Sequence, residues 1–463
     1  MASGWVITVL CVAVSCGVSD MAASVLSPFF PEWAANEKNL TETQVASVFS
    51  VPMAAGLVAA PFSPRLIAAV GPRKTFYAGL LVNAGLCAAF SLLSKVPKGE
   101  RFLLAALGVR AAQGAATAVA DTAGFGIATR AAPQGKAAIA IAWLEATRSI
   151  GMLAAPPIGG YLFKIGGFAL PFLVVTVICL CVLLPLLLFT ACNASAARSA
   201  TNAQRRLLMT QSAPPATIRR LLRFPVVWMQ FIMIIVALTA LTFLQPTLQP
   251  FLAQPPTSMP PITVGLAFST ETIAYIFSSV LAGPLSQKIG SRTQLILGSL
   301  LVVIGFLLIG PAPFLRGAHG APLLPRQHSG ALVFIALGLI GTGSGLAYTP
   351  TNDLALEGCR RRGVSVASAS DPLGALVNLG FLLGALSGPL LGGALVDYAG
   401  FPWASTGFGL SLAALLPFVL PCLCEREPPS EAIAALANGM LRSEQGGGPS
   451  HVEPLAEGKA MNV

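Results

Sequence analysis

Long apolar stretches alternate with short polar stretches along the whole chain. Twelve of the apolar stretches approach the roughly 20 residues that an α-helix needs to cross the hydrocarbon core of a bilayer. They cover residues 5–28, 43–63, 75–94, 102–129, 137–163, 168–191, 225–253, 263–285, 293–314, 331–356, 364–396 and 402–424. These stretches are far too long for barrel strands, and helices satisfy their own backbone hydrogen bonds in lipid. The pattern predicts an all-α polytopic membrane protein with twelve transmembrane helices.

One apolar stretch occurs twice, which indicates two related halves. Residues 151–168 read GMLAAPPIGGYLFKIGGF, and residues 384–401 read GALSGPLLGGALVDYAGF. Aligned end to end without gaps, the two share Gly, Leu, Pro, Gly, Gly, Leu, Gly and Phe. A match at such a distance in the chain is typical of a duplicated unit, and in an apolar protein it predicts two pseudo-symmetric six-helix halves.

The polar stretches divide the chain into four parts. We expect an N-terminal half over residues 1–191, a basic central loop over 192–224 and a C-terminal half over 225–424. The remaining residues, 425–463, are polar and aperiodic and contain several Gly, so we expect a disordered tail there. Because the number of helices is even, both termini lie on the same side of the membrane.

The distribution of Lys and Arg predicts the orientation. If the N-terminus is cytoplasmic, the loops on that side hold 16 Lys and Arg, and the opposite loops hold seven. The positive-inside rule therefore places both termini in the cytoplasm. The sequon Asn39-Leu40-Thr41 then lies in the first outer loop, where we expect glycosylation of Asn39, whereas a second sequon at Asn193 faces the cytoplasm.

Composition narrows the classes of function. Hydrophobic residues make up 55% of the chain and charged residues only 10%, whereas about 25% charged residues are usual in a globular domain. The net charge of +10 comes from loops whose arginines suit an anionic lipid surface. The chain has no phosphate-binding loop, nucleophile elbow, dinucleotide fingerprint or metal-ligand motif. We therefore expect no enzymatic activity, no cofactor, no metal site and no nucleic-acid partner.

A few ionisable side chains lie inside the predicted helices, and each is a functional candidate because burying a charge in lipid is costly. They are Asp20, Arg110, Asp121, Glu145, Arg148, Glu271 and Asp353, with Asp371 near a helix end. Acids outnumber bases in this set. Such an excess can hold a cationic substrate, and it can carry protons because desolvation favours a neutral carboxylic acid.

In the N-terminal half, the spacing of these residues predicts shared helix faces. Glu145 and Arg148 are three residues apart and can pair directly, in a structural or a functional pair. Arg110 and Gln113 also share a face, and Asp121 follows Arg110 by eleven residues, about 16 Å along the axis. Arg110 and Asp121 therefore lie on one stripe without touching. The alternative for Arg110 is a structural donor to neighbouring carbonyl groups.

In the C-terminal half, Glu271 lies in the middle of a predicted helix with Tyr275 one turn later. A carboxylate this deep beside a phenol predicts a site for a cation, and the alternative is an intrahelical hydrogen bond. Asp20 and Asp353 are nearer to helix ends, where capping or contact with water are equal alternatives.

Several motifs resemble those of the major facilitator superfamily, and within it those of the drug:proton antiporters. The stretch Arg110-Ala-Ala-Gln-Gly resembles the fourth-helix motif, whose arginine that family uses in proton coupling. The fifth-helix motif Gly-Pro-x-x-Gly-Gly is matched from Ala155 to Gly160, with Ala for the first Gly, and fully from Gly388 to Gly393. Pro and Gly break helical regularity and allow close backbone approach, so we expect bends in both copies and hypothesise that they act as a gate. The residues concerned are Pro156, Pro157, Gly159, Gly160, Gly388, Pro389, Gly392 and Gly393.

A narrower resemblance is to the vesicular amine transporters, in particular to the vesicular polyamine transporter branch. The similar stretches are Pro28-Phe-Phe-Pro, Leu144-Glu145, Pro246-Thr-Leu, Val264-Gly-Leu with Tyr275, and Gly310-Pro-Ala-Pro. Two loop positions depart from the superfamily pattern, since Ala68 and Gln287 stand where it has Asp.

The charged residues and the resemblance together predict a proton-coupled antiporter of organic cations, of the polyamine or monoamine class, that works by alternating access. Its partners are a small cationic substrate, protons and the lipid bilayer of a vesicle or another organelle, and we expect a monomer. The expected substrate-binding residues are Asp20, Glu145, Glu271 and Tyr275, and the expected proton-coupling residues are Arg110, Asp121, Glu145 and Arg148. The alternatives are a broad drug exporter or an organic-anion carrier of the same fold, and a membrane receptor or scaffold without transport.

Overall fold

The computed structural model describes residues 2–133, 137–192, 221–255, 257–310, 329–364 and 366–423. Its contacts group Met1–Val419 into one compact unit and Leu420–Val463 into a second, of which only the last residues of a helix are described. The expected tail, the sequon at Asn193 and most of the central loop lie outside the described residues.

Each of the first six predicted membrane segments is one long helix. These helices are α1 (Ala2–Ser24), α3 (Glu42–Ala59), α5 (Pro72–Ser91), α6 (Glu100–Ala131), α7 (Ala137–Gly166) and α8 (Ala169–Cys192). Two shorter helices, α2 (Phe30–Lys38) and α4 (Ser63–Val70), were not predicted. The sequence of α2, FPEWAANEK, mixes apolar and charged residues, so it has no run long enough to stand out from the loops around it.

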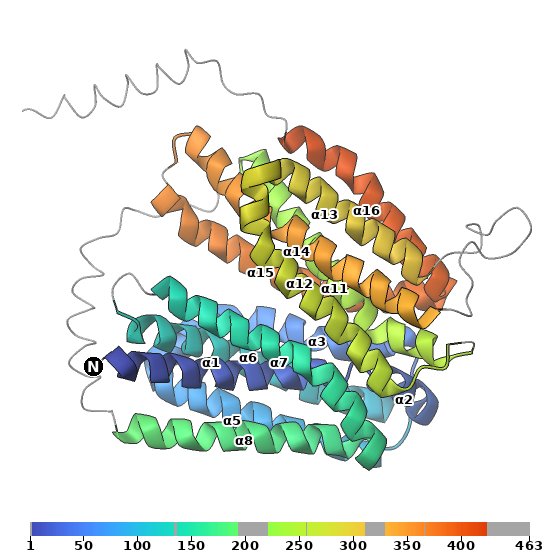
Figure 1. The fold of residues 1–463 in the computed structure, drawn as a ribbon. Helices are drawn as coiled ribbons and strands as arrows, with labels where there is room; N and C mark the ends of the chain where they lie inside the picture. The colour runs from blue at the N-terminus through green and yellow to red at the C-terminus, as the bar shows by residue number, and fades with distance from the viewer. Residues whose placement is uncertain are drawn as a thin grey trace, which may run out of the picture. The chain divides into compact units, whose positions relative to one another are not determined.

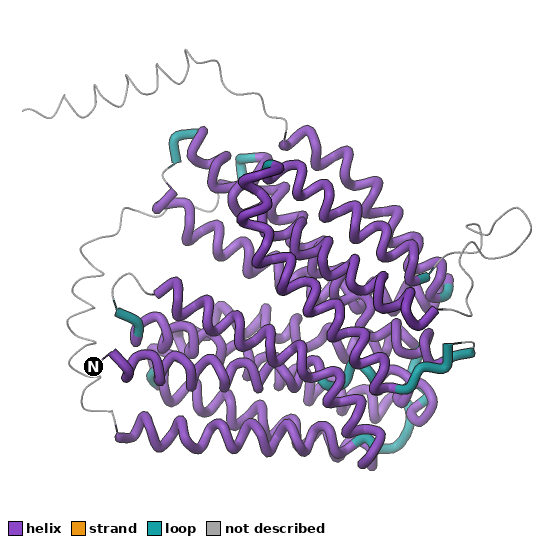
Figure 2. Tube along the Cα trace, in the orientation of Figure 1, coloured by secondary structure: helices purple, strands orange, loops and turns teal. Residues whose placement is uncertain are grey.

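Each of the last six predicted segments is also one long helix. These helices are α11 (Pro225–Ala253), α12 (Pro261–Ile289), α13 (Ser291–Ile309), α14 (Ser329–Arg361), α15 (Val366–Ala399) and α16 (Phe401–Leu423). Figures 1 and 2 show that the described residues form helices and loops, without a strand. In the part of the chain that the structure describes, nine helices are long and apolar enough to cross a membrane. The prediction of an all-α membrane protein is confirmed.

Local sequence signals set where these helices begin. Thr41 caps α3, because its hydroxyl accepts a hydrogen bond from the Gln44 amide nitrogen at 3.3 Å while the Gln44 side chain accepts one from the Thr41 amide at 3.1 Å. Gly71 separates α4 from α5 with a φ of 94°, which Gly adopts without steric strain. Pro72 follows at the first position of α5, where its missing N–H leaves no hydrogen bond unmade.

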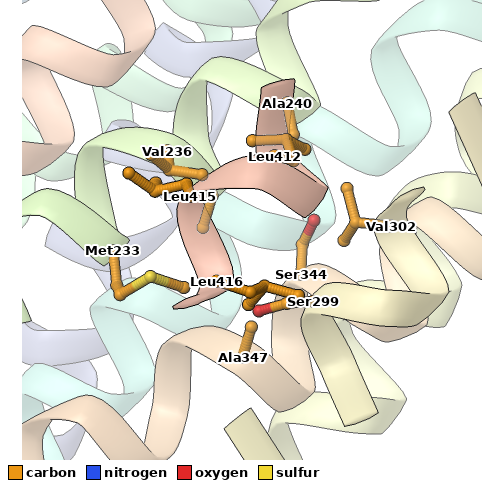
Figure 3. Close-up of a pocket in the computed structure, with 11 residues that line it drawn as sticks. Met233, Val236, Ala240, Ser299, Val302, Ser344, Ala347, Leu412, Leu415 and Leu416 are labelled. Carbon is orange, nitrogen blue, oxygen red and sulfur yellow. The ribbon is translucent and has the colours of Figure 1, made fainter. Parts of the chain in front are cut away.

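In the C-terminal half, a small pocket lies between α11, α13, α14 and α16 (Figure 3). Its lining is mostly aliphatic, with Met233, Val302 and Leu412 among the side chains, and two hydroxyl groups, of Ser299 and Ser344, contribute the polar part. The pocket contains none of the ionisable residues predicted from the sequence. We therefore do not place the substrate site there.

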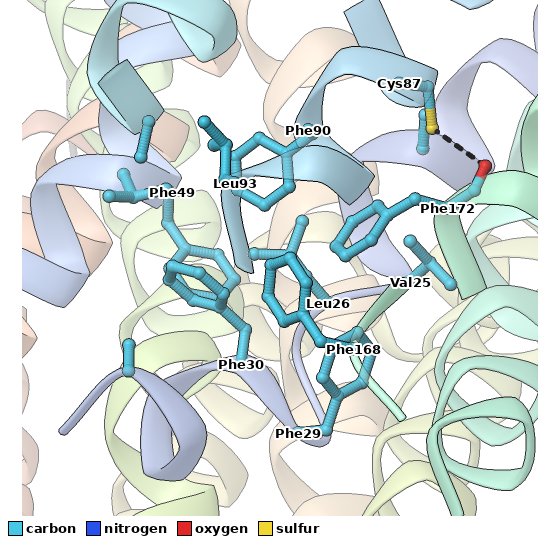
Figure 4. Packing of buried hydrophobic residues seen from close by; sticks show 14 of the residues in the cluster. Val25, Leu26, Phe29, Phe30, Phe49, Cys87, Phe90, Leu93, Phe168 and Phe172 are labelled. Atoms are coloured by element: carbon cyan, nitrogen blue, oxygen red, sulfur yellow. Dashed lines mark hydrogen bonds between the residues drawn. The ribbon is translucent and has the colours of Figure 1, made fainter. Parts of the chain in front are cut away.

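In the N-terminal half, aromatic rings fill one end of the core (Figure 4). Phe29 ends the turn between α1 and α2, and Phe30 is the first residue of α2. Both are buried and pack on Phe168, and Phe29 also packs on Phe172 near the start of α8. Phe29 and Phe172 pack edge to face with ring centroids 5.9 Å apart, an arrangement that aromatic quadrupoles favour. This cluster fixes the loop between α1 and α2 on the rest of the half.

Four pairs of helices make the main contacts between the two halves: α7 packs on α12, α3 on α15, and both α2 and α3 on α11. We call this junction the seam. Glycines bring the backbones together there, since a Cβ on Gly160 of α7 would lie 2.6 Å from the Pro261 carbonyl oxygen of α12. A Cβ on Gly393 of α15 would lie 2.7 Å from the Glu42 carbonyl oxygen of α3. The seam therefore forms at the start of α3 and α12 and towards the end of α7 and α15.

Candidate functional site

The guanidinium of Arg148 is the centre of a cluster of charges in the N-terminal half. Its Nε lies 2.6 Å from Oδ2 of Asp20 on α1, and its Nη2 lies 3.4 Å from Oδ2 of Asp121 on α6. Its Nη1 lies 3.5 Å from Oε1 of Glu145, one turn earlier on α7. Three acids from three helices thus share one cation. The predicted pair of Glu145 and Arg148 is present, and the shortest contact of Arg148 is with Asp20.

Burial differs across this cluster. The side chains of Asp20 and Asp121 are 11% and 16% exposed, whereas that of Glu145 is 55% exposed. One guanidinium balances one of the three carboxylates when all are ionised, so the cluster favours further positive charge, supplied either by protons or by a bound cation. Glu145 is the acid that a solute can reach most easily.

Two glycines explain why Asp20 meets Arg148. A Cβ on Gly151 of α7 would lie 2.1 Å from the Gly17 carbonyl oxygen of α1, and a Cβ on Gly17 would lie 2.5 Å from the Thr147 carbonyl oxygen. The two backbones therefore cross in direct contact. Asp20 is three residues after Gly17, and Arg148 is three residues before Gly151, so the crossing brings the two charges together. The capping alternative for Asp20 is wrong, because it lies inside α1 and is 8% exposed.

Arg110 is separate from this cluster. Its residue is 3% exposed, and its guanidinium donates to the carbonyl oxygens of Val48 at 3.3 Å and Ala22 at 3.4 Å and to Oε1 of Gln113 at 2.9 Å. Among the described residues no acidic side chain pairs with it. Arg110 and Asp121 do not form an ion pair, as the spacing predicted. The contacts match the alternative of a structural donor, and a role in proton coupling stays a prediction.

Glu271 is a buried acid on α12. It is 5% exposed, and its Oε1 has no hydrogen bond within the described part of the chain. The backbone around it is tightly packed, because a Cβ on Gly341 of α14 would lie 2.1 Å from the Glu271 carbonyl oxygen. The carboxyl group is therefore buried rather than open to a solute in this conformation, and α14 packs directly on the backbone of α12 at this residue.

Two phenols of the C-terminal half lie near Glu145 of the N-terminal half. Tyr275 on α12 and Tyr348 on α14 both lie close enough to Glu145 to interact with it electrostatically. The Tyr348 ring also packs edge to face on Phe381 of α15, with centroids 6.4 Å apart. The spacing from Glu271 predicts a role for Tyr275, whereas nothing in the sequence of α14 relates Tyr348 to α7.

The two copies of the antiporter motif make equivalent contacts. In the first copy, Gly159 packs on the Val25 carbonyl within its own half, and Gly160 packs across the seam. In the second copy, Gly392 packs on Phe243 of α11 within its own half, and Gly393 packs across the seam. Adjacent glycines thus serve one contact inside a half and one between halves.

The prolines and the remaining glycine of the motif are also packed. Pro156 and Pro389 are buried inside continuous helices, and the Pro156 carbonyl oxygen would lie 2.6 Å from a Cβ on Gly265 of α12. Pro157 lies next to the same glycine. A Cβ on Gly388 would meet the Thr242 hydroxyl.

Three further predicted residues lie away from this cluster. Asn39 is exposed in the left-handed conformation directly after α2, with a φ of 58°. Asp353 is exposed on α14. The side chain of Asp371 lies outside the described residues.

Comparison with known proteins agrees with this architecture. Residues 12–370 match the family described as the Major Facilitator Superfamily. The chain belongs to this superfamily. The human MFS-type transporter SLC18B1 is 28% identical to it over 397 residues, which cover 85% of this chain and 80% of the relative. The synaptic vesicular amine transporter of Rattus norvegicus is 25% identical, with 84% of this chain and 67% of the relative covered.

Solved structures share the fold. The crystal structure of a bacterial homologue of the human lysosomal transporter Spinster, in an inward-facing and unoccupied conformation, matches with a TM-score of 0.65. The match covers 91% of this chain and 96% of that chain at 13% sequence identity, so it concerns the fold alone. The predicted resemblance to the major facilitator superfamily and to its vesicular amine transporters is confirmed, and the protein is an integral multi-pass membrane transporter.

Proposed function

We propose that this chain is a proton-coupled antiporter of organic cations, of the polyamine or monoamine class, in the membrane of a vesicle or another organelle. The observation that carries this proposal is the convergence of Asp20, Asp121 and Glu145 on the single cation Arg148. Such a site attracts a cation and repels an anion. The names of two relatives, a synaptic vesicular amine transporter and a vesicular acetylcholine transporter, support the same class of substrate.

Substrate binding is assigned to the exposed part of this cluster. An incoming ammonium group pairs with Glu145, the most accessible acid, while Tyr275 offers an aromatic face from the other half. Asp20 becomes available when the ammonium competes with Arg148 for its carboxylate. The site lies between the halves 1–191 and 225–424, so rocking of these halves exposes it to each side in turn.

Proton coupling is assigned to the acids that can lose their charge. Asp121 and Glu145 share Arg148 with Asp20, so a proton on either one relieves the excess of negative charge. Glu271 has no counter-ion among the described residues, and a buried carboxyl of this kind is more stable in its neutral form. Arg110 holds α6 to α1 and α3 through carbonyl contacts, which positions the helix that carries Asp121.

The expected orientation places both termini and the central loop 192–224 in the cytoplasm, with the exposed Asn39 on the lumenal side as a glycosylation site. A glycosidase shift that disappears with Asn39→Gln supports this orientation. A shift that persists in Asn39→Gln and disappears with Asn193→Gln contradicts it.

The experiment that tests the function is uptake by proteoliposomes containing the purified protein. We expect uptake of spermidine or serotonin to require an acidic interior and to collapse with nigericin, and we expect a dicarboxylate not to compete. Uptake that ignores the pH gradient contradicts antiport. Competition by the dicarboxylate supports the anion carrier, and uptake of many unrelated cationic drugs supports the broad exporter. Saturable binding without flux supports the receptor. The receptor is an alternative because Ala68 and Gln287 replace the Asp of the two superfamily loop motifs.

A further inference from the structure

Two helix N-termini of the first half receive their hydrogen-bond acceptors from the second half. At the start of α3, the amide nitrogens of Glu42 and Thr43 donate to Oδ1 and Oδ2 of Asp397 on α15, at 3.0 Å and 2.8 Å, and the Thr43 hydroxyl also donates to Oδ2. At the start of α2, the Glu32 amide nitrogen donates to Oε1 of Gln249 on α11 at 2.8 Å, and the Gln249 amide group donates back to the Glu32 carboxylate.

These contacts supply acceptors for N–H groups that a helix cannot satisfy by itself. The first four N–H groups of an α-helix have no partner inside the helix. Thr41 satisfies only the Gln44 amide at the start of α3, which leaves the amides of Glu42 and Thr43 for another acceptor. A carboxylate suits this position because the N-terminus of a helix carries partial positive charge. The second half thus completes the capping of α3, which Thr41 begins, and supplies the acceptor for the Glu32 amide at the start of α2.

The sequence of α15 places Asp397 for this contact. Asp397 follows Gly393 by four residues and lies on the same helix face. Gly393 packs directly on the Glu42 carbonyl oxygen, so the helix is already held against the start of α3 when Asp397 reaches its amides. The final glycine of the second antiporter motif and an acid one turn later therefore act as one unit.

The first copy of the repeat has the opposite charge at the equivalent place. Lys164 follows Gly160 by four residues, as Asp397 follows Gly393. The partner helix α12 begins with Pro260 and Pro261, which have no N–H to donate. An acid at residue 164 would find fewer amide donors there than Asp397 finds at the start of α3, since only the residues after Pro261 have an N–H. The acid at residue 397 and the base at residue 164 therefore match the number of N–H donors at the start of the helix that each one faces across the seam.

We propose that Asp397 and Gln249 form a two-point latch that holds the seam closed, and that this latch opens when the transporter alternates. The inference is independent of the substrate and of proton coupling. It needs only that the two halves move relative to each other, as in other members of the superfamily. Asp397 and Gln249 are positioning residues, and opening the seam transfers the amides of residues 32, 42 and 43 from their side-chain acceptors to water.

Hydrogen–deuterium exchange of the full-length protein in lipid nanodiscs tests the latch without any substrate. In Asp397→Ala, we expect the amides of Glu42 and Thr43 to exchange at least about tenfold faster, the lower end of the range for losing a hydrogen bond to a charged group. If the latch acts as a unit, the Glu32 amide also exchanges several-fold faster, although its own acceptor Gln249 is unchanged. Gln249→Ala has the reciprocal effect on residues 42 and 43. Tyr398→Phe is the control, because Tyr398 is 92% exposed beside Asp397.

Local capping without a latch predicts a different result. Faster exchange confined to residues 42 and 43 in Asp397→Ala, with the Glu32 amide unchanged, overturns the proposal. Thr43→Val provides a milder variant that keeps the carboxylate, and it should give a smaller effect in the same direction at all three amides. Unchanged exchange at the amides of residues 32, 42 and 43 in Thr43→Val also overturns the proposal.

A crosslink tests the latch from the opposite direction. The pair Thr43→Cys and Asp397→Cys, oxidised to a disulfide, should slow exchange of the Glu32 amide below that of the wild type, and a reductant should restore it. The pair Thr43→Cys and Tyr398→Cys and the oxidised wild type, with its nine cysteines, are the controls. A crosslinked protein with unchanged exchange at Glu32 overturns the proposal.

Discussion

The Arg148 guanidinium on α7 lies 2.6 Å from the Asp20 carboxylate on α1, across 128 residues of sequence. The contact holds the first and fifth membrane helices together through a charge pair that is largely removed from water. Because Asp121 and Glu145 contact the same guanidinium, loss of Arg148 affects three acids, whereas loss of Asp20 removes one of three partners. Replacing Arg148 should therefore lower the stability of the fold more than replacing Asp20.

The first prediction concerns this inequality. Arg148→Gln leaves three carboxylates together without a cation, and we expect it to lower the free energy of unfolding by about 1–3 kcal/mol, below the value for a fully buried pair because the Arg148 side chain is 28% exposed. Asp20→Asn should cost less. Thermal unfolding in detergent, followed by intrinsic fluorescence, measures both. In the double variant Asp20→Asn with Arg148→Gln, the effects should not add. Additive effects would contradict the charge cluster.

The helix crossing that creates this contact gives the second prediction. Gly151→Ala places a methyl group 2.1 Å from the Gly17 carbonyl oxygen, so α1 and α7 must separate. We expect a loss of about 1–3 kcal/mol in stability and weaker binding of the substrate, because Asp20 moves away from Arg148. Gly108→Ala on α6 is the matched control, since a Cβ there meets nothing within 4 Å and Ala favours the helix. Equal stability of the two variants would count against the crossing.

The sequence was sufficient to predict the helices but not their crossings. The twelve long helices follow from the length of each apolar run, which is a property of local sequence. The pairing of Glu145 with Arg148 follows from helical spacing, which is also local. The pairing of Asp20 with Arg148 depends on where α1 meets α7, and the only local signal is that Gly17 and Gly151 each lie three residues from a charge. Tyr348 carries no such signal, because its position near Glu145 depends on how the halves meet.

The third prediction concerns Glu271. Because its carboxyl is buried and its Oε1 has no partner among the described residues, Glu271→Gln removes no ion pair, and we expect stability equal to the wild type or higher. Transport should lose its dependence on the pH gradient, since the amide cannot bind and release a proton. Proteoliposome uptake at several internal pH values measures this change. The variant Glu145→Gln should instead raise the KM for the amine. Gradient-driven uptake by Glu271→Gln at the wild-type rate would rule out this role for Glu271.

The fourth prediction concerns the glycines of the seam. Gly393→Ala places a methyl group 2.5 Å from the Ala46 side chain and 2.7 Å from the Glu42 carbonyl oxygen. The start of α3 is held there by backbone hydrogen bonds and by Asp397, so α15 must move outward and the seam can no longer close fully. We expect the transport rate to fall at least tenfold. The free energy of unfolding should fall by only about 1–3 kcal/mol, because the contact is a small part of the whole interface. Gly374→Ala on the same helix is the matched control, since its Cβ meets nothing within 4 Å. Uptake and thermal unfolding are measured on the same preparations, and wild-type uptake by Gly393→Ala would show that close contact at the seam is not required for the transport cycle.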